Sequence, residues 1–348
     1  MERSTRLDGL DVARLLAFIG MVIVNFKIVM GVPYDASGWL VILTSLLEGR
    51  AAATFVVLAG LGLGLAAVRG DYSQTVSVTL KRAAFLLVLG LLNSLIFEAD
   101  ILHYYAFYFL FGVFCLGLSN RLMVASVIAL NIAFVVMILT LNYDAEWNWT
   151  DFSYQGFWTL SGFVKNLFFN GWHPVIPWLS FFLVGICLSR LDLRIHRTRN
   201  RLMMFGLIGS IVASLTSAVL IHLLAGDPET AILFTTEPIP PMPLYVIAGL
   251  SEAVVTMMLC LYLGDWLQKK NLLGYLVPAG RQTLTLYIAH IIIGMVLLEA
   301  FGLVGDQSIG AALLAALLFS LASIVYAFVW AQFFKRGPLE SLMRLVAG

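Results

Sequence analysis

Charged residues are scarce in this sequence. Lys, Arg, Asp and Glu together make up 12% of the 348 residues, whereas soluble domains contain roughly a quarter. Hydrophobic residues make up 61% of the chain. So little polar side-chain area cannot cover a soluble protein of this length, and the composition therefore indicates an integral membrane protein.

Cysteine is also rare, and the signature motifs of several enzyme classes are missing. Cys115, Cys187 and Cys260 lie inside apolar runs without CxxC spacing, which argues against a disulfide framework or a thiolate metal site. The sequence contains no HExxH, glycine-rich phosphate loop or GxSxG motif. We therefore expect no metal and no covalently bound cofactor.

The net charge is only +1, which predicts no nucleic-acid partner. The basic loops are instead expected to meet membrane lipids with anionic headgroups, or a cytosolic anion. Most of these basic residues are explained by membrane topology alone, because Lys and Arg are retained on the cytoplasmic side.

Apolar runs about 20 residues long, enough to cross a hydrocarbon core of ~30 Å, recur along the whole chain. They lack strict alternation of period two, which favours helices over a barrel. We predict an all-α, polytopic membrane bundle with about ten transmembrane helices in a single integral domain, residues 1–348. The predicted spans are residues 12–32, 48–68, 80–98, 101–118, 122–142, 175–190, 202–225, 243–264, 283–303 and 309–334.

The distribution of Lys and Arg predicts the orientation of this bundle. Of the 21 Lys and Arg residues, only Lys27, Arg50 and Lys165 lie on the outward side of the predicted map, and the other 18 lie on the inward side. Both termini are therefore expected in the cytoplasm. The first span begins among several charges and has no small-residue cleavage site, so we do not interpret it as a removable signal peptide.

The longest irregular stretch, residues 142–173, lies on the outward side of the map. It contains Trp147, Trp149, Trp158 and Trp172, an aromatic density typical of the membrane interface. We interpret this stretch as a lid over the outer end of the bundle. Whether the lid binds a substrate or has no chemical role stays open.

Two polar residues share one face of the first span. Eleven steps of about 100° place Arg14 and Asn25 within about 20° of each other around a helix, with a rise of about 16 Å between them. Asp11 precedes Arg14 by three residues and can pair with it. One interpretation is a polar conduit through the bundle. The alternative is an anchor in which Arg14 snorkels and Asn25 bonds a neighbouring helix.

A second polar group stands at the turn between the third and fourth spans. Asp100 and His103 are one helical turn apart, so the carboxylate can orient the imidazole and increase its basicity, as a general base requires. An Asp and a His at a membrane interface are also common without catalysis. Both interpretations stay open.

Further ionisable residues lie where a membrane would disfavour them, and these are candidates for a site or for structural pairs. Glu48 and Arg50 near the outer surface do not face each other and are expected to pair elsewhere. His173 is expected to be exposed, in contact with substrate or headgroups. Glu252 and His290 fall near mid-depth of their spans and are expected to face a cavity or a partner.

Five stretches together carry a family resemblance, which extends over nearly the whole chain. They are LDGLDVARLLAFIGMVIVNF, ADILHYYAFYFLFG, GWHPVIPWLSFFLVGICLSRLDL, GRQTLTLYIAH and KRGPLESLMR. In this order they resemble the YeiB-like family of bacterial membrane proteins, a branch of the transmembrane acyltransferase superfamily that includes heparan-alpha-glucosaminide N-acetyltransferase. The resemblance implies an integral protein of the bacterial cytoplasmic (inner) membrane.

The resemblance also implies roles for particular residues. Acyl-CoA is the expected donor, and its phosphates should bind at the cytoplasmic mouth. The candidate donor-binding residues are Arg14, Arg69, Arg82 and Arg281. In the related acetyltransferase the Asn that matches Asn25 is followed by a His that takes part in acetyl transfer, but the segment after Asn25 contains no His here.

His103, oriented by Asp100, is the candidate substitute for this base, and Asn25 is the candidate oxyanion donor. The expected reaction moves an acyl group to a hydroxyl or amine of an unidentified envelope acceptor on the outer side. Two other functions stay open: a carrier or exporter of a small anion or lipid-linked metabolite, and a non-catalytic membrane scaffold. Association into a homo-oligomer also stays open.

Overall fold

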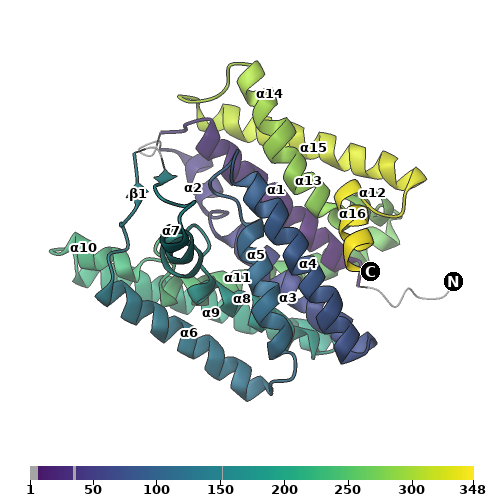
Figure 1. The fold of residues 1–348 in the computed structure, drawn as a ribbon, viewed down its shortest axis with the longest axis horizontal. Coiled ribbons are helices and arrows are strands. Elements are labelled where there is room, and N and C mark those ends of the chain that lie inside the picture. Colours follow the sequence, from purple (N-terminus) through teal and green to yellow (C-terminus); the bar gives the residue numbers. More distant parts are fainter. Residues whose placement is uncertain (1–6, 34–36, 151) are drawn as a thin grey trace. The chain divides into compact units, whose positions relative to one another are not determined.

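The computed structural model describes residues 7–33, 37–150 and 152–348, and these residues are almost entirely helical (Figure 1). The only strands among them form one short antiparallel hairpin. The elements in chain order are α1 (Gly9–Val29), α2 (Trp39–Ser45), α3 (Arg50–Arg69), α4 (Tyr72–Asn93), α5 (Leu102–Cys115), α6 (Asn120–Thr140), β1 (Trp147–Asn148), β2 (Ser153–Tyr154), α7 (Leu160–Lys165), the π-helix η1 (Asn166–Asn170), α8 (Val175–Ser189), α9 (His196–Leu223), α10 (Pro228–Ala231), the 3-10 helix η2 (Ile232–Phe234), α11 (Pro243–Lys269), α12 (Leu273–Arg281), α13 (Thr283–Ala289), the π-helix η3 (His290–Gly294), α14 (Met295–Ala300), α15 (Ile309–Phe333) and α16 (Pro338–Ala347).

The predicted polytopic helical membrane bundle is confirmed. Within the described residues, eight helices are long and apolar enough to cross a membrane, and a bent pair, Leu160–Asn170 with Val175–Ser189, makes up to nine. Only 11% of the most apolar window of the helix at Asn120–Thr140 is buried inside the protein. A soluble protein does not expose so much apolar surface, whereas a helix facing lipid does.

Each of the ten predicted spans overlaps a helix, but the fourth span is shorter than expected. The sequence predicts a crossing helix over residues 101–118, whereas α5 has 14 residues, or about 21 Å at the usual helical rise. This length is below the ~30 Å of a hydrocarbon core. The start of α5 agrees with the predicted span to within one residue, but the helix ends at Cys115, before the predicted end. The count of ten includes α5 and the bent pair.

Contacts divide the chain into two compact units. The first unit contains residues 1–55 and 253–345, and the second contains residues 56–252 and 346–348. Each unit is described by itself below. The prediction of a single integral domain stays a prediction.

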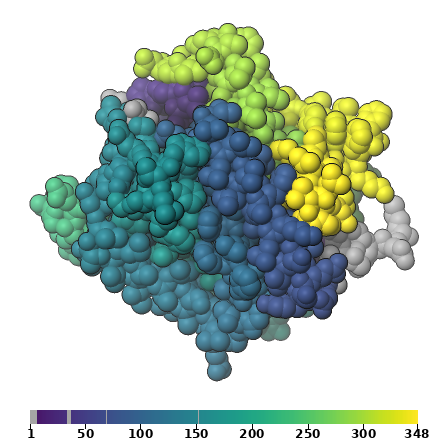
Figure 2. All heavy atoms as spheres, viewed as in Figure 1, coloured from purple at the N-terminus to yellow at the C-terminus, as the bar shows by residue number. Residues whose placement is uncertain are grey.

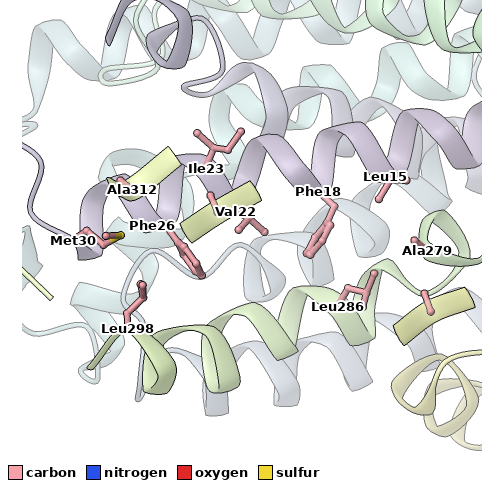
Figure 3. Packing of buried hydrophobic residues seen from close by; sticks show 12 residues of the cluster. Leu15, Phe18, Val22, Ile23, Phe26, Met30, Ala279, Leu286, Leu298 and Ala312 are labelled. Atoms are coloured by element: carbon pink, nitrogen blue, oxygen red, sulfur yellow. The ribbon is translucent and has the colours of Figure 1, made fainter. Parts of the chain in front are cut away.

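The first unit is built around α1. Leu15, Phe18 and Val22 recur at helical spacing along α1 and are almost completely buried, and the same cluster includes Leu286 and Leu298. Figure 3 shows Phe18 and Phe26 of α1 pointing toward the segment that carries Leu286 and Leu298. Between helices in lipid, such a contact is stabilised by van der Waals packing of the apolar side chains. The N-terminal helix is therefore part of the core of its unit.

The C-terminal helix α16 joins the first unit through one carboxylate. Glu340 Oε1 accepts hydrogen bonds from the backbone N–H groups of Leu284 and Thr285 at 2.8 and 3.1 Å, and Oε2 accepts one from Thr285 Oγ1 at 2.5 Å. The first N–H groups of a helix have no partner within it, so Glu340 completes the start of α13. Burial raises the pKa of Glu340.

The opposite face of this C-terminal segment is exposed. The segment, yellow in Figure 2, lies at the surface of the view. Leu342 and Leu345 are 46% and 82% exposed, three residues apart on the same side of α16. The helix is therefore amphipathic: its polar contacts face α13, and its apolar residues face outward.

In the second unit, α3 and α8 pack closely through glycines. A side chain at Gly60 of α3 would overlap the backbone oxygen of Phe182 in α8, and one at Gly185 of α8 would overlap the backbone oxygen of Val57 in α3. Small residues of this kind are typical of closely packed membrane helices. The glycines let the two backbones come closer than any larger residue would permit.

The substitution Gly60→Ala is expected to destabilise the protein by about 1–3 kcal/mol, because the added methyl group has no space beside Phe182. The measurement is the thermal unfolding midpoint of the purified protein in detergent. Gly117→Ala is the matched control, because nothing lies within 4 Å of a side chain added there. Equal midpoints for the two variants would contradict the close packing of α3 and α8.

Candidate functional site

Asp100 and His103 form a buried pair in the second unit. Asp100 Oδ1 accepts a hydrogen bond from Asn93 Nδ2 at 2.7 Å, and Oδ2 accepts one from the Leu102 N–H at 2.8 Å. His103 Nδ1 lies 3.2 Å from the same Oδ2 atom. Both side chains are 1% exposed or less. The carboxylate therefore fixes the start of α5 and the His103 ring together.

The two nitrogens of His103 have different surroundings. Because a carboxylate only accepts hydrogen bonds, the contact with Asp100 places the proton of the neutral ring on Nδ1. His103 Nε2 is buried, and no described residue donates to it or accepts from it. A histidine with Nδ1–H held by a carboxylate and a lone pair on Nε2 has the geometry of a general base.

Helix α4 packs directly against this histidine. A side chain at Gly90 of α4 would overlap the backbone nitrogen of His103, and Asn93, one turn further along α4, donates to Asp100. On the other side the Tyr104 ring lies 3.9 Å from the His103 ring, centre to centre. The imidazole is therefore held by packing as well as by its hydrogen bond.

Residues 142–173, called loop 142–173 below, also contact the pair. The rings of Phe157 and Phe163 lie 5.6 and 6.4 Å from the His103 ring. Tyr104 donates to Asn166 Oδ1 at 2.5 Å. These contacts enclose His103 between α5 and the loop, with several aromatic rings around it.

Asn170 organises the interior of this loop. Its Nδ2 donates to the backbone oxygens of Tyr143 and Ala145 at 2.9 and 2.8 Å, and its Oδ1 accepts from the Tyr154 hydroxyl at 2.9 Å. Burial raises the pKa of Tyr154, so the phenol stays a hydrogen-bond donor. Asn170 therefore connects residues near the start of the loop with the hairpin β1–β2.

His173 is less accessible than the sequence suggests. The side chain is half-buried, its ring packs 4.6 Å from that of Trp178, and its backbone oxygen accepts from Tyr108 at 2.6 Å. The expectation of an exposed histidine is wrong because α5 and α8 pack against it. Its Nδ1 is buried, and no described residue bonds to it.

A separate polar pair lies in the first unit. Asn25 Nδ2 of α1 is 2.9 Å from His290 Nε2, and His290 is completely buried. Its Nδ1 lies against the backbone oxygen of Tyr287. The two predicted candidates Asn25 and His290 are thus brought together, although 265 residues separate them in the chain.

Arg14 and Arg281 meet at Asp11, also in the first unit. Arg14 lies 2.5 Å from Asp11 Oδ1, as its spacing predicts. Arg281 lies 3.2 Å from Asp11 Oδ2 and 3.0 Å from Asp8. Asp11 is 1% exposed, whereas Arg281 is 40% exposed. The guanidinium of Arg281 is partly exposed and has more N–H groups than these two contacts use, so it can also donate to an anion.

The other candidates are dispersed. Glu48 pairs with Lys27 at 2.6 Å, which supplies the partner that the sequence did not identify, and Arg50 begins α3. Glu252 accepts from Ser210 of the neighbouring helix α9 at 3.0 Å.

Two further donor-binding candidates belong to the second unit. Arg82 is half-buried in α4. Arg69 ends α3, and its side chain lies outside the described part of the structure. Among the residues that are described, no group of three or more His, Cys, Asp or Glu could hold a metal ion.

Comparisons with known families give two overlapping matches. The family described as heparan-alpha-glucosaminide N-acetyltransferase, catalytic, matches residues 6–225. The family described as protein of unknown function (DUF418) matches residues 189–348. No curated protein and no solved structure matches the chain. The first match contains Asp100, His103 and loop 142–173, and the second contains His290 and Glu340.

The substitution Asn170→Ala is expected to loosen loop 142–173, because it leaves buried polar groups without partners at about 1–3 kcal/mol each. The measurement is hydrogen exchange of the loop peptides in detergent. Asn148→Ala is the matched control, because the Asn148 side chain accepts a hydrogen bond from the nearby Thr150 N–H and from no other described residue. If both variants exchange like the parent protein, Asn170 does not organise the loop.

Proposed function

The chain belongs to the family of the heparan-alpha-glucosaminide N-acetyltransferase catalytic domain, whose model matches more than half of its residues, and we propose on this basis that it is an acyltransferase. In the proposed reaction, an acyl group passes from cytoplasmic acyl-CoA to an acceptor at the outer side of the membrane. The acceptor carries a hydroxyl or an amine. We further propose that the protein resides in the bacterial inner membrane with both termini in the cytoplasm. The distribution of Lys and Arg supports this orientation.

One observation carries the proposal: His103 has a carboxylate on one ring nitrogen and no described partner on the other. In the proposed reaction, Nε2 takes the proton of the acceptor hydroxyl or amine as that group attacks the thioester carbonyl carbon. The carbon–sulfur bond breaks, and its electron pair leaves with the CoA sulfur. The proton then passes from His103 to this thiolate, which returns the histidine to its starting state.

Two further groups have proposed roles. Asn25 donates a hydrogen bond to the oxyanion that develops on the thioester carbonyl. Arg14 and Arg281, with Arg69 and Arg82, bind the phosphates of CoA. The exposure of Arg281 supports this assignment, because its guanidinium has more donors than its two contacts with aspartates use.

The substitution His103→Ala is expected to reduce acyl transfer by about 10²–10⁴-fold, the usual contribution of a general base. The measurement is transfer of labelled acetyl from acetyl-CoA to an added amine or hydroxyl acceptor by protein in liposomes. His222→Ala is the matched control, since His222 is exposed on α9. Undiminished transfer by the His103 variant would exclude this residue as the base.

The substitution Arg14→Ala is expected to weaken binding of acetyl-CoA by about 10- to 150-fold, because one charge-assisted contact contributes about 1.5–3 kcal/mol. Isothermal titration in detergent measures the dissociation constant. Arg121→Ala is the control, because Arg121 is exposed at the start of α6. Equal affinities for the Arg14 variant and the parent protein would mean that the phosphates bind elsewhere.

A further inference from the structure

Two completely buried histidines, one in each unit, differ in one respect. His103 has a ring nitrogen that no described residue contacts. His290 uses both ring nitrogens: Nδ1 faces the Tyr287 backbone oxygen and Nε2 faces Asn25 Nδ2. A base must offer a lone pair to the substrate, and His290 has none left to offer.

The contacts of His290 also fix which atoms carry hydrogens. A backbone carbonyl only accepts, so His290 Nδ1 carries the proton of the neutral ring. Nε2 then accepts, and the group that faces it must donate. The Asn25 amide therefore turns its nitrogen toward His290, and one of its two N–H bonds is used there.

We propose that His290 is a positioning residue: by accepting one N–H of Asn25, it aims the second N–H at the carbonyl oxygen of a bound acyl thioester. This inference rests on the proposed function, because it takes acyl-CoA as the ligand. It assigns His290 a role distinct from proton transfer, and it assigns Asn25 a fixed orientation. Asn25 is only half-buried, so a bound molecule can approach its amide.

The surroundings of His290 hold the ring in place. The Phe18 ring lies edge-on at 6.1 Å, and the Tyr287 ring at 4.9 Å. His290 begins the π-helix η3, a local widening that is frequent at functional sites. At the end of this turn, a side chain at Gly294 would lie 2.9 Å from the Phe26 ring, so α1 and η3 fit closely on both sides of the Asn25 contact.

The far end of the same helical segment is anchored by Glu340. This carboxylate bonds the N–H groups of Leu284 and Thr285 in the first turn of α13, and His290 follows directly after the last residue of α13. Helix α13 is thus held at its start by α16 and at its end by α1. His290 is therefore supported by contacts between two segments of the chain, the C-terminal stretch KRGPLESLMR and the stretch GRQTLTLYIAH.

Two substitutions separate positioning from proton transfer. His290→Gln places an amide oxygen close to the position of Nε2, so it still accepts from Asn25 but cannot transfer a proton. His290→Leu removes the acceptor. We expect His290→Leu to lower kcat by about 10²-fold, as loss of an oxyanion donor does, with KM for acetyl-CoA changed less than about threefold.

His290→Gln is expected to keep kcat within about tenfold of the parent protein. Equal losses in the Gln and Leu variants would overturn the proposal and make His290 a proton-transfer group. His222→Gln is the control for an exposed histidine. Thermal unfolding of each variant separates loss of function from loss of fold.

Infrared spectroscopy tests the same contact without turnover. Acetyl-CoA labelled with ¹³C at the thioester carbonyl is bound to the protein in detergent, and the carbonyl stretch is compared with that of free acetyl-CoA. We expect a lower frequency in the parent protein and in His290→Gln, and a return toward the free value in Asn25→Leu and His290→Leu.

A bound carbonyl with the frequency of free acetyl-CoA in the parent protein would overturn this inference and the role of Asn25 as a donor to the carbonyl oxygen. It would not overturn acyl transfer with His103 as the base, which His103→Ala tests separately. Conversely, a shifted carbonyl with no acyl transfer would overturn the proposed reaction and keep the role of His290 in orienting Asn25. If acetyl-CoA does not bind at all, both fail.

Discussion

Asp100 has no exposed surface, and several hydrogen-bond donors surround its carboxyl group. In an apolar bundle an isolated carboxylate would be very costly, and it becomes tolerable when hydrogen bonds satisfy both oxygens. Asn93 of α4, the first backbone N–H of α5 and the His103 ring supply them. The same interaction therefore determines where α5 begins, how α4 and α5 face each other and which nitrogen of His103 is left for a substrate.

The two polar groups differ in how their histidines are bonded. In the pair of Asp100 and His103, the buried Nε2 has no described partner, and the proposed reaction uses this nitrogen for proton transfer. The pair of Asn25 and His290 has saturated ring nitrogens and a donor amide, which suits orientation of a ligand. The proposed reaction therefore does not require a histidine soon after Asn25, because His103 is the proposed base.

Hydropathy and local spacing predicted the features that are determined by residues close together in the sequence, namely the helices and the pairs within one helix. Long apolar runs identified a helix at each predicted span, and a separation of three residues predicted the pairing of Asp11 with Arg14. The early end of the fourth span was not predicted. The predicted start agrees with that of α5 to within one residue, but the helix stops at Cys115, and hydropathy counts apolar residues without detecting where a helix ends.

Contacts between distant residues could not be predicted in this way. A single sequence does not connect Asn25 with His290 or Thr285 with Glu340. Several polar residues could be the partner of each side chain, and only the packing of the helices determines which one it contacts. The partner of Glu48 was missed for the same reason: Lys27 stands near the end of α1, and charge alone does not select it.

Chemical rescue can show whether a base oriented by Asp100 accepts the proton during acyl transfer. The His103→Ala protein is assayed for acyl transfer with and without free imidazole, alongside the double variant that also carries Asp100→Asn. The account predicts that imidazole restores a substantial part of the transfer to the single variant and little to the double variant. No recovery in the single variant, or equal recovery in both, would contradict it.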